Sequence, residues 1–208
     1  FENKLSSLTK SKNVICTSTG TNALHIALKC IGIKKNDEII LPSFNYIASA
    51  NVILYENSHP VFVDIEERNL GIDPKRLEKF LSKNSKLRRN NCINSKTGRR
   101  IKGIIVFHAF GHPSSILDII KVAKKYKLKI IEDAAEGIGS FYRSKHLGTF
   151  GDIGIISFNG NKTITTGGGG AILTNKKNYA NRARLLCSIG RQNHSWKYKY
   201  TELGYNYR

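Results

Sequence analysis

Apolar residues along the chain fall into short continuous runs, which alternate with stretches whose apolar positions repeat every three or four residues. The short runs predict strands, and runs without polar alternation are typical of strands that are covered on both faces. The strands predicted in this way are residues 14–17, 38–41, 60–64, 101–107, 129–133, 153–158 and 171–174.

The intervening stretches predict helices, because their apolar residues share one face of a helical repeat. Leu24, Leu28 and Ile31 form such a face in a helix predicted over residues 22–31. Other helices are predicted at residues 1–8, 46–55, 116–126 and 179–186, and from Asp73-Pro74 onward. The alternation predicts an α/β fold with a mainly parallel sheet between helices.

Residues 83–100 show neither pattern, because they are polar and basic throughout. They separate the helix that opens at Asp73-Pro74 from the strand at 101–107. We interpret them as an exposed excursion that ends in a Lys-Thr-Gly-Arg turn at 96–99.

The composition narrows the class of protein. The chain has 208 residues, enough for one or two domains, and its four cysteines include no CxxC pair. Cys16 and Cys30 lie among apolar residues, so we expect buried thiols in a reducing, cytoplasmic compartment. No apolar run approaches the roughly 20 residues of a membrane helix. Because methionine is absent and the chain opens on a helical pattern, we expect an interior piece of a longer protein.

The formal net charge is +19, which is typical of proteins that bind nucleic acid or anionic membranes. The basic residues are scattered, however, and no zinc-finger, RNP or helix-turn-helix pattern accompanies them. We therefore expect an enzyme without a nucleic-acid or membrane partner, whose charge also favours anionic small substrates. A basic nucleic-acid-binding protein remains the alternative from another class.

Polar motifs follow several predicted strands, and ligands of open parallel sheets bind beyond the carboxyl ends of strands. Ser-Thr-Gly-Thr-Asn at 18–22 stands before a helix, where amides and hydroxyls can bind phosphate. A plain helix cap is the alternative for this turn. Glu-Asp-Ala-Ala-Glu at 132–136 could bind a cation, act as a base or cap a turn. Because no His or Asp stands at metal-ligand spacing, we expect no metal.

Lys162 lies in a loop between the strand that ends near Ser157 and four glycines at 167–170. A lysine among small and polar groups can form an imine, and it does so as the neutral amine. Tyr46 follows another strand, and its ring could stack on a planar ligand or fill the core. A phosphate cradle, a strand-end carboxylate, a stacking ring and a loop lysine are together what pyridoxal phosphate requires.

These motifs make the chain similar to the DegT/DnrJ/StrS family of nucleotide-sugar aminotransferases, which have fold type I. The Ser-Phe-Asn-Gly-Asn-Lys form at 157–162 and the basic excursion most resemble the branch that acts on UDP-linked 4-keto-6-deoxy-hexosamines, in bacillosamine or legionaminic acid pathways. The blocks that carry the resemblance follow family order and spacing, and they are residues 18–25, 37–43, 60–64, 132–136, 148–152, 157–170 and 204–208.

The resemblance implies a role for each matched residue. Lys162 would bond covalently to pyridoxal 5'-phosphate and then carry the proton, and Asp133 would pair with the pyridine nitrogen. Glu136 would reach the phenolic oxygen of the ring, where many relatives have Gln, and Tyr46 would stack on the ring. The groups implied to hold the phosphate are Gly20, Thr21, Asn22 and Ser157, with Asn206 from a neighbouring subunit.

The implied reaction moves an amino group from glutamate to a nucleotide-linked 4-keto-6-deoxy sugar, in the biosynthesis of bacterial surface polysaccharide or lipopolysaccharide. The implied assembly is a homodimer with shared active sites. Residues 1–208 would be a partial cofactor-binding large domain that lacks its first element and the C-terminal small domain. A sugar dehydratase of the same fold is an alternative, although family dehydratases carry His where this chain has Lys162. A catalytically silent regulatory relative is another.

Overall fold

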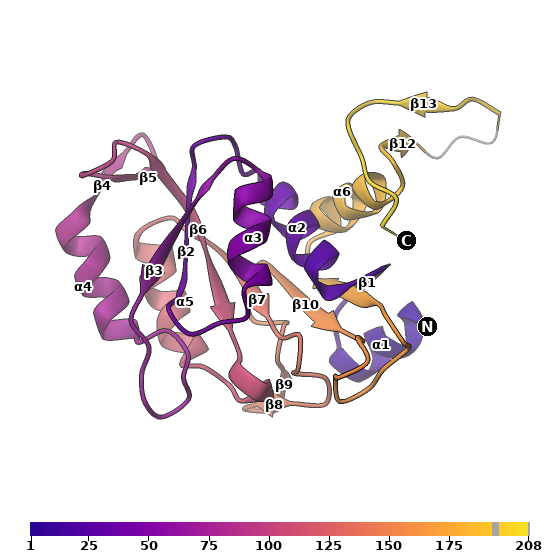
Figure 1. Ribbon diagram of the computed structural model, residues 1–208, viewed down its shortest axis with the longest axis horizontal. Coiled ribbons are helices and arrows are strands. Elements are labelled where there is room, and N and C mark those ends of the chain that lie inside the picture. The colour runs from indigo at the N-terminus through magenta and orange to yellow at the C-terminus, as the bar shows by residue number, and fades with distance from the viewer. Residues whose placement is uncertain (193–195, 208) are drawn as a thin grey trace.

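The computed structural model describes residues 1–192 and 196–207, built around one mixed sheet (Figure 1). The sheet has the strand order β1-β11-β10-β7-β6-β2-β3. Neighbours from β10 to β3 are parallel, whereas β11 runs antiparallel to both β1 and β10. The prediction of a mainly parallel sheet is confirmed. The strands are β1 Asn13–Thr17, β2 Glu38–Pro42, β3 His59–Val63, β6 Arg100–Phe107, β7 Lys129–Asp133, β10 Ile153–Ser157 and β11 Gly170–Thr174.

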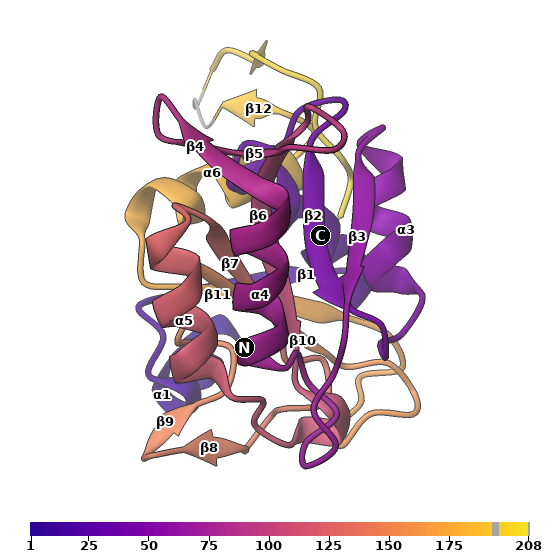
Figure 2. The ribbon, with the colours of Figure 1, turned by 90° about the vertical axis from the view of Figure 1, so that its left-hand side faces the viewer.

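Helices cover both faces of the sheet, as Figures 1 and 2 show. Successive strand residues point to opposite faces, so in β2 Ile39 and Leu41 pack under one helical layer and Ile40 under the other. The first layer consists of α2 Gly20–Cys30, α3 Ala48–Tyr55 and α6 Lys177–Cys187, and the second of α4 Pro74–Asn84 and α5 Ile116–Lys125. A smaller core joins Leu5 of α1 Glu2–Thr9 to β1, β10 and β11.

Two helix starts differ from the prediction, and both differences affect the candidate site. α2 begins at Gly20 rather than at residue 22, because the Thr19 hydroxyl caps it by accepting the Asn22 amide at 3.0 Å. α3 begins at Ala48 rather than at residue 46, so Tyr46 lies in the loop that precedes the helix. Both loops therefore remain at the carboxyl edge of the sheet.

Most of residues 83–100 are exposed and a turn precedes residue 100, as expected, but the segment also contains two strands that the sequence pattern did not predict. β4 Ser85–Arg88 and β5 Asn91–Asn94 form a hairpin, and β5 pairs antiparallel with β6. Cys92 is 1% exposed, and the Asn94 amide donates to Glu38 Oε2 at 2.8 Å. The tight turn takes positive φ at Arg89 and Asn90. Because only Cys92 and Asn94 of this hairpin are buried, its apolar pattern is too weak to recognise.

Several smaller features complete the description. Short hairpins that the sequence pattern did not predict are β8 Phe141–Tyr142 with β9 Lys145–His146, and β12 Arg191–Gln192 with β13 Lys199–Tyr200. Burial raises the pKa of the Cys30 thiol to about 12, whereas Cys16 is only partly buried, which corrects the expectation for Cys16. No disulfide joins the cysteines within the described residues. In the same part of the chain, no helix is both long and apolar enough to cross a membrane.

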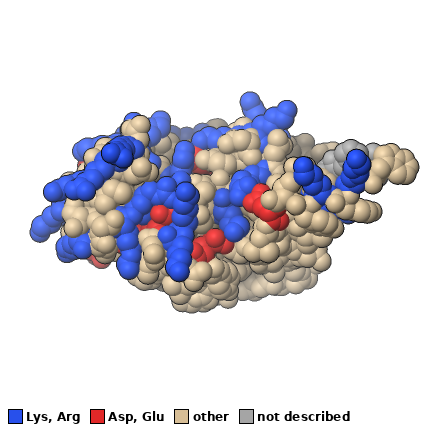
Figure 3. All heavy atoms as spheres, turned by 90° about the horizontal axis from the view of Figure 1, so that it is seen from above, with Lys and Arg blue, Asp and Glu red and all other residues tan. Residues whose placement is uncertain are grey.

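Lys and Arg side chains gather over the face at the amino ends of the parallel strands, which Figure 3 views from above. Near the start of β6, burial and the neighbouring charge of Arg100 lower the pKa of Lys102. Asp37 neutralises Arg100 through two hydrogen bonds, at 2.9 and 2.5 Å. This basic face therefore lies at the opposite ends of the strands from the polar motifs.

Candidate active site

The fold brings four predicted polar positions to one edge of the sheet. Asp133 ends β7 and pairs in register with Ile155 of the neighbouring strand β10, which ends at Ser157. β1 runs in the same direction as β10, and Ser18 follows its last residue. Lys162 lies in the loop that leaves this edge after β10.

The first turn of α2 packs directly against the end of β10. A Cβ on Gly20 would lie 2.9 Å from Ser157 Cβ, so a side chain at this position would collide with the strand. A Cβ on Gly170 would likewise lie 2.6 Å from Gly20 N. The side-chain Nδ2 of Asn22 donates to Ser18 Oγ at 2.8 Å, while Thr21 is partly exposed on the same turn.

This arrangement suits an anion, because the positive end of a helix dipole lies beside two hydroxyl-bearing residues. The helix cap that the sequence left as an alternative is also present, since Thr19 performs it. The two interpretations are compatible, because the cap uses Thr19 and leaves the hydroxyls of Thr21 and Ser157 for a ligand.

Asp133 is a buried carboxylate, with 3% of its surface exposed. Ser49 Oγ donates to Oδ2 at 2.9 Å, and the Ala135 amide donates to Oδ1 at 3.2 Å. Burial raises the pKa of Asp133, although these two hydrogen bonds and the charges of His108 and Lys162 act in the opposite direction. These groups therefore only partly offset the cost of burying the ionised carboxylate. A ligand with a protonated ring nitrogen beside Asp133 Oδ would stabilise the ionised form further.

Lys162 and Glu136, which the sequence placed on separate segments, form an ion pair. Lys162 Nζ donates to Glu136 Oε1 at 3.0 Å, and the two side chains are 17% and 27% exposed. The loop is turned at this point by a hydrogen bond from the Lys162 amide to Asn159 O at 3.0 Å. Lys162 is thus held at the mouth of the site, near enough to act electrostatically on Asp133.

Tyr46 has an exposed ring, with 69% of the residue accessible. The alternative that this ring fills the core is therefore wrong. Its carbonyl accepts the Ser49 amide at 3.0 Å, and Ser49 in turn donates to Asp133. The Tyr46 loop is consequently tied to the buried carboxylate, with its ring available at the edge of the site.

Asn206 is exposed on the last described segment, and Arg208 of the same motif lies outside the described residues. Asn206 bridges to Ser188 in the backbone, and Tyr207 O accepts the Ser18 amide at 2.8 Å. Within the described part of the chain, no hydrogen bond joins the Asn206 side chain to another candidate residue. The fold brings this segment to the turn at residues 18–22, which we call the cradle turn, but leaves Asn206 exposed.

A second buried carboxylate, Glu132, lies next to Asp133 in β7, and its structural role was not predicted from the sequence. Glu132 is fully buried and accepts the amides of Gly148 and Gly151 at 2.9 and 2.5 Å. His108 Nδ1 accepts the Ser114 amide, so its Nε2 proton points to Glu132 Oε2 at 3.0 Å. Two features of the sequence could have indicated this pair: the charged Glu132 lies inside an apolar strand, and His108 directly follows another apolar strand. Ser49 had none, because only the tertiary fold brings it to Asp133.

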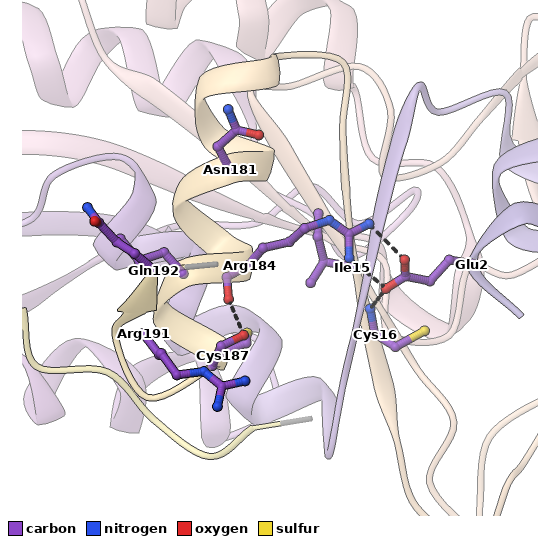
Figure 4. A pocket seen from close by; sticks show the side chains of 10 residues that line it. Glu2, Ile15, Cys16, Asn181, Arg184, Cys187, Arg191 and Gln192 are labelled. Carbon is purple, nitrogen blue, oxygen red and sulfur yellow. Dashed lines mark hydrogen bonds and ion pairs between the residues drawn. The ribbon is translucent and has the colours of Figure 1, made fainter. Parts of the chain in front are cut away.

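A well-defined pocket lies elsewhere. It has a volume of about 700 Å³ and opens between α1, β1 and α6 (Figure 4). Arg184 reaches across it to Glu2, with Nη2 2.7 Å from Oε2, and Glu2 also accepts the Cys16 amide at 2.9 Å. None of the candidate residues lines this pocket. No group of three His, Cys, Asp or Glu side chains among the described residues is arranged to hold a metal ion.

The mainly parallel sheet with helices on both faces has the architecture of fold type I pyridoxal-phosphate enzymes. The model of the DegT/DnrJ/EryC1/StrS aminotransferase family matches residues 1–208, and the chain belongs to that family. Aminotransferases of this family depend on pyridoxal phosphate. The cofactor fits the residues present: the start of α2 can bind an anion, Asp133 is a buried carboxylate that needs a cationic partner, and Lys162 is near enough to act electrostatically on Asp133.

Curated relatives match all or nearly all of the chain and extend well beyond it. GDP-perosamine synthase of Escherichia coli O157:H7 is 38% identical over 208 residues, which are 100% of this chain and 52% of that protein. UDP-N-acetyl-3-dehydro-alpha-D-glucosamine 3-aminotransferase of Acidithiobacillus ferrooxidans is 34% identical over 193 residues, 92% of this chain and 47% of that protein. The chain thus spans about half the length of the curated relatives it matches.

A solved structure likewise matches the whole chain and extends beyond it. NtdA of Bacillus subtilis with bound cofactor PMP superimposes with a TM-score of 0.83 and 31% sequence identity. The superposition covers 100% of this chain and 43% of that one. The fold type I architecture and the cofactor class are therefore shared with a structure in which a cofactor is bound.

Proposed function

We propose that the full-length protein is a pyridoxal-phosphate-dependent aminotransferase that transfers an amino group from glutamate to a keto sugar linked to a nucleotide. The observation that carries this proposal is the convergence of the α2 cradle, buried Asp133 and the Lys162–Glu136 pair at one edge of the sheet. Residues 1–208 would then supply most of the cofactor-binding large domain, and the rest of the protein would complete the sugar site.

Each residue has a role that follows from its position. Lys162 would leave Glu136 to bond with the cofactor and would later move the proton at the reacting carbon. The carboxylate of Asp133 would keep the ring nitrogen protonated, and the bound cofactor would then act as an electron sink. Glu136 would face the phenolic oxygen, and the exposed Tyr46 ring would cover the cofactor ring. The phosphate would be held by Ser157, Thr21 and the backbone of Gly20 and Asn22.

The names of the two relatives support a nucleotide-sugar substrate, since one contains GDP and the other UDP. We infer a 4-keto-6-deoxy sugar linked to UDP, with dTDP or GDP as alternatives, and a place in surface-glycan biosynthesis. The net charge of +19 would favour a diphosphate. The absence of disulfides among the described cysteines supports a cytoplasmic enzyme.

For the assembly we propose a homodimer in which Asn206 of one subunit reaches the cofactor phosphate of the other. The exposed position of Asn206 supports this arrangement, because its amide could donate to a phosphate oxygen without adding charge. Mixing two full-length variants, Lys162→Ala and Asn206→Ala, tests it. Shared sites predict that hybrid dimers regain one complete site and partial activity, whereas verified subunit exchange without any recovery would refute sharing.

The decisive experiment for the activity is an absorbance spectrum of the full-length protein with pyridoxal phosphate, followed by assays with glutamate. A visible band that disappears on adding glutamate, and returns with a keto sugar linked to UDP, dTDP or GDP, would support the proposal. Lys162→Ala is the control, since it should bind the cofactor without the covalent band. A preference for a free 2-keto acid over every nucleotide sugar would contradict the proposed substrate.

The basic face in Figure 3 favours one second candidate, a protein that binds nucleic acid. Such binding would fall steeply as salt increases, because counterions are released from the phosphates. Retention of DNA or RNA at low salt, together with no covalent cofactor band, would replace the aminotransferase proposal with this one.

A further inference from the structure

His25, which lies on α2 behind the cradle turn, connects three segments that are far apart in the sequence. It is 4% exposed, and its Nε2 lies 2.7 Å from Glu56 Oε1, just beyond the end of α3. Its Nδ1 lies 3.3 Å from the hydroxyl of Tyr207 in the last described segment. Since a neutral imidazole has one donor and one acceptor nitrogen, His25 can donate to Glu56 while accepting from Tyr207.

Aromatic contacts reinforce this connection. The rings of Tyr205 and Tyr207 stack with centroids 4.9 Å apart, and the Tyr205 ring meets His25 edge-on, also at 4.9 Å. Lys29, one turn further along α2, lies 5.5 Å above the Tyr205 ring and 3.4 Å from Glu56. The hydrogen bond from His25 is the largest cause that lowers the pKa of Glu56, so the cluster keeps this carboxylate ionised. We refer to His25, Lys29, Glu56, Tyr205 and Tyr207 as the α2 clamp.

Backbone hydrogen bonds hold the same segment in an extended form. The Tyr205 amide donates to Leu186 O at 2.7 Å, and the Tyr207 amide donates to Cys187 O at 3.3 Å. Tyr207 O accepts the Ser18 amide at 2.8 Å, directly at the cradle. In an extended segment alternate side chains share one side, so the two tyrosines face His25 and the intervening Asn206 points the opposite way.

We propose that His25 and Glu56 are positioning residues: they fix the two tyrosines that flank Asn206 and thereby present Asn206, away from its own chain, to the cofactor phosphate of a second copy. This inference rests on the proposed function and its shared sites. A single amide–phosphate hydrogen bond contributes only when its donor is held in place, because a mobile donor loses the gain to ordering entropy. The clamp supplies that constraint from both sides of Asn206.

The competing interpretation is that the clamp merely stabilises α2 and so supports the cradle of its own subunit. The two interpretations differ in which subunit is affected. A positioning role through Asn206 acts on the site of the partner, whereas support of α2 acts on the site of the same chain. Hybrid dimers separate them, because one subunit can be made to contribute Asn206 alone.

The experiment uses full-length hybrid dimers purified with two different tags, in which one subunit carries Lys162→Ala. The single covalent site then combines Lys162 of the intact subunit with Asn206 of the Lys162→Ala subunit. His25→Ala is placed either on the Lys162→Ala subunit or on the intact one, and the dissociation constant for pyridoxal phosphate is measured from the covalent absorbance band, together with turnover. His59→Ala is the matched control, because the only hydrogen bond described for the His59 side chain is a long one to Asn36, at 3.5 Å.

We expect His25→Ala on the Lys162→Ala subunit to weaken cofactor binding about tenfold or more, the range of one hydrogen bond to a charged group. When His25→Ala is placed on the intact subunit, the dissociation constant for pyridoxal phosphate should stay close to that of the His59→Ala control. Equal effects in both arrangements, or an effect only on the intact subunit, would overturn the positioning role. If His25→Ala subunits fail to fold, Tyr207→Phe replaces His25→Ala, because it removes only the hydroxyl. Placed on the Lys162→Ala subunit, it should weaken cofactor binding at the covalent site of the partner, with a smaller effect.

One further hybrid separates failure of this inference from failure of the proposed function. Asn206→Ala on the Lys162→Ala subunit should impair the covalent site as His25→Ala does. If Asn206→Ala has no effect there, sites are not shared and that part of the proposed function is wrong. If Asn206→Ala impairs the site but His25→Ala does not, sharing stands and the clamp is not what positions Asn206.

Discussion

Replacing Asp133 with asparagine should stabilise the cofactor-free protein while it destroys the catalytic site. The wild-type carboxylate is buried, and burial raises its pKa above the ordinary 3.8. The native state then binds a proton more tightly than the unfolded chain, so stability falls as pH rises from about 3.8 through the folded-state pKa. Above that pKa the full cost applies, about 1.4 kcal/mol for each unit by which the folded-state pKa is raised.

The structure indicates that asparagine can occupy the same space without a new unsatisfied group. Its oxygen can still accept the Ala135 amide, and its NH₂ can donate to Ser49, whose hydroxyl can rotate and become the acceptor. The variant therefore removes the buried charge and keeps both hydrogen bonds. We expect a gain of about 1 kcal/mol or more at neutral pH, which corresponds to about 2–4 °C in a domain of this size.

Thermal unfolding of the cofactor-free, full-length protein at several pH values measures this effect. The gain from Asp133→Asn should be full at neutral pH and should shrink as pH approaches the ordinary Asp range, where the wild-type carboxyl is protonated in both states. Asp64→Asn is the control, because its side chain is 65% exposed. With cofactor added the order should reverse, and transamination should be slower by orders of magnitude, equivalent to several kcal/mol. A variant less stable than wild type, or a gain independent of pH, would refute the reasoning.

Other predictions concern single contacts. Borohydride reduction of the full-length protein with pyridoxal phosphate, followed by peptide mapping, should label Lys162, and a label on another lysine would refute its role. Gly20→Ala should cost about 1–3 kcal/mol by overpacking, because its Cβ would lie 2.9 Å from Ser157, and denaturant unfolding should show partial recovery in Gly20→Ala/Ser157→Gly without recovery of cofactor affinity. Cys30, with its pKa raised to about 12 by burial, should resist alkylation in the folded protein at neutral pH, and rapid modification would contradict its burial.

Strands buried on both faces were predictable because they require continuous apolar runs, and β7 was predicted with its observed bounds, Lys129–Asp133. The hairpin at residues 85–94 was not, because its first strand buries no residue and its second strand buries only Cys92 and Asn94. Strand direction could not be predicted either, because β11 is as buried as the parallel strand β10 beside it and yet runs antiparallel to it.

For the site, the sequence by itself determined which residues stand at strand ends, since chemistry-bearing side chains there interrupt apolar runs: Asp133, Ser157 and, in the next loop, Lys162. Only the tertiary structure decided their partners. Ser49 meets Asp133, and Tyr207 meets His25 across 182 positions, through contacts that no local pattern encodes. Secondary structure follows from near neighbours in the chain, whereas burial, hydrogen-bond partners and the raised pKa of Asp133 depend on which elements pack together.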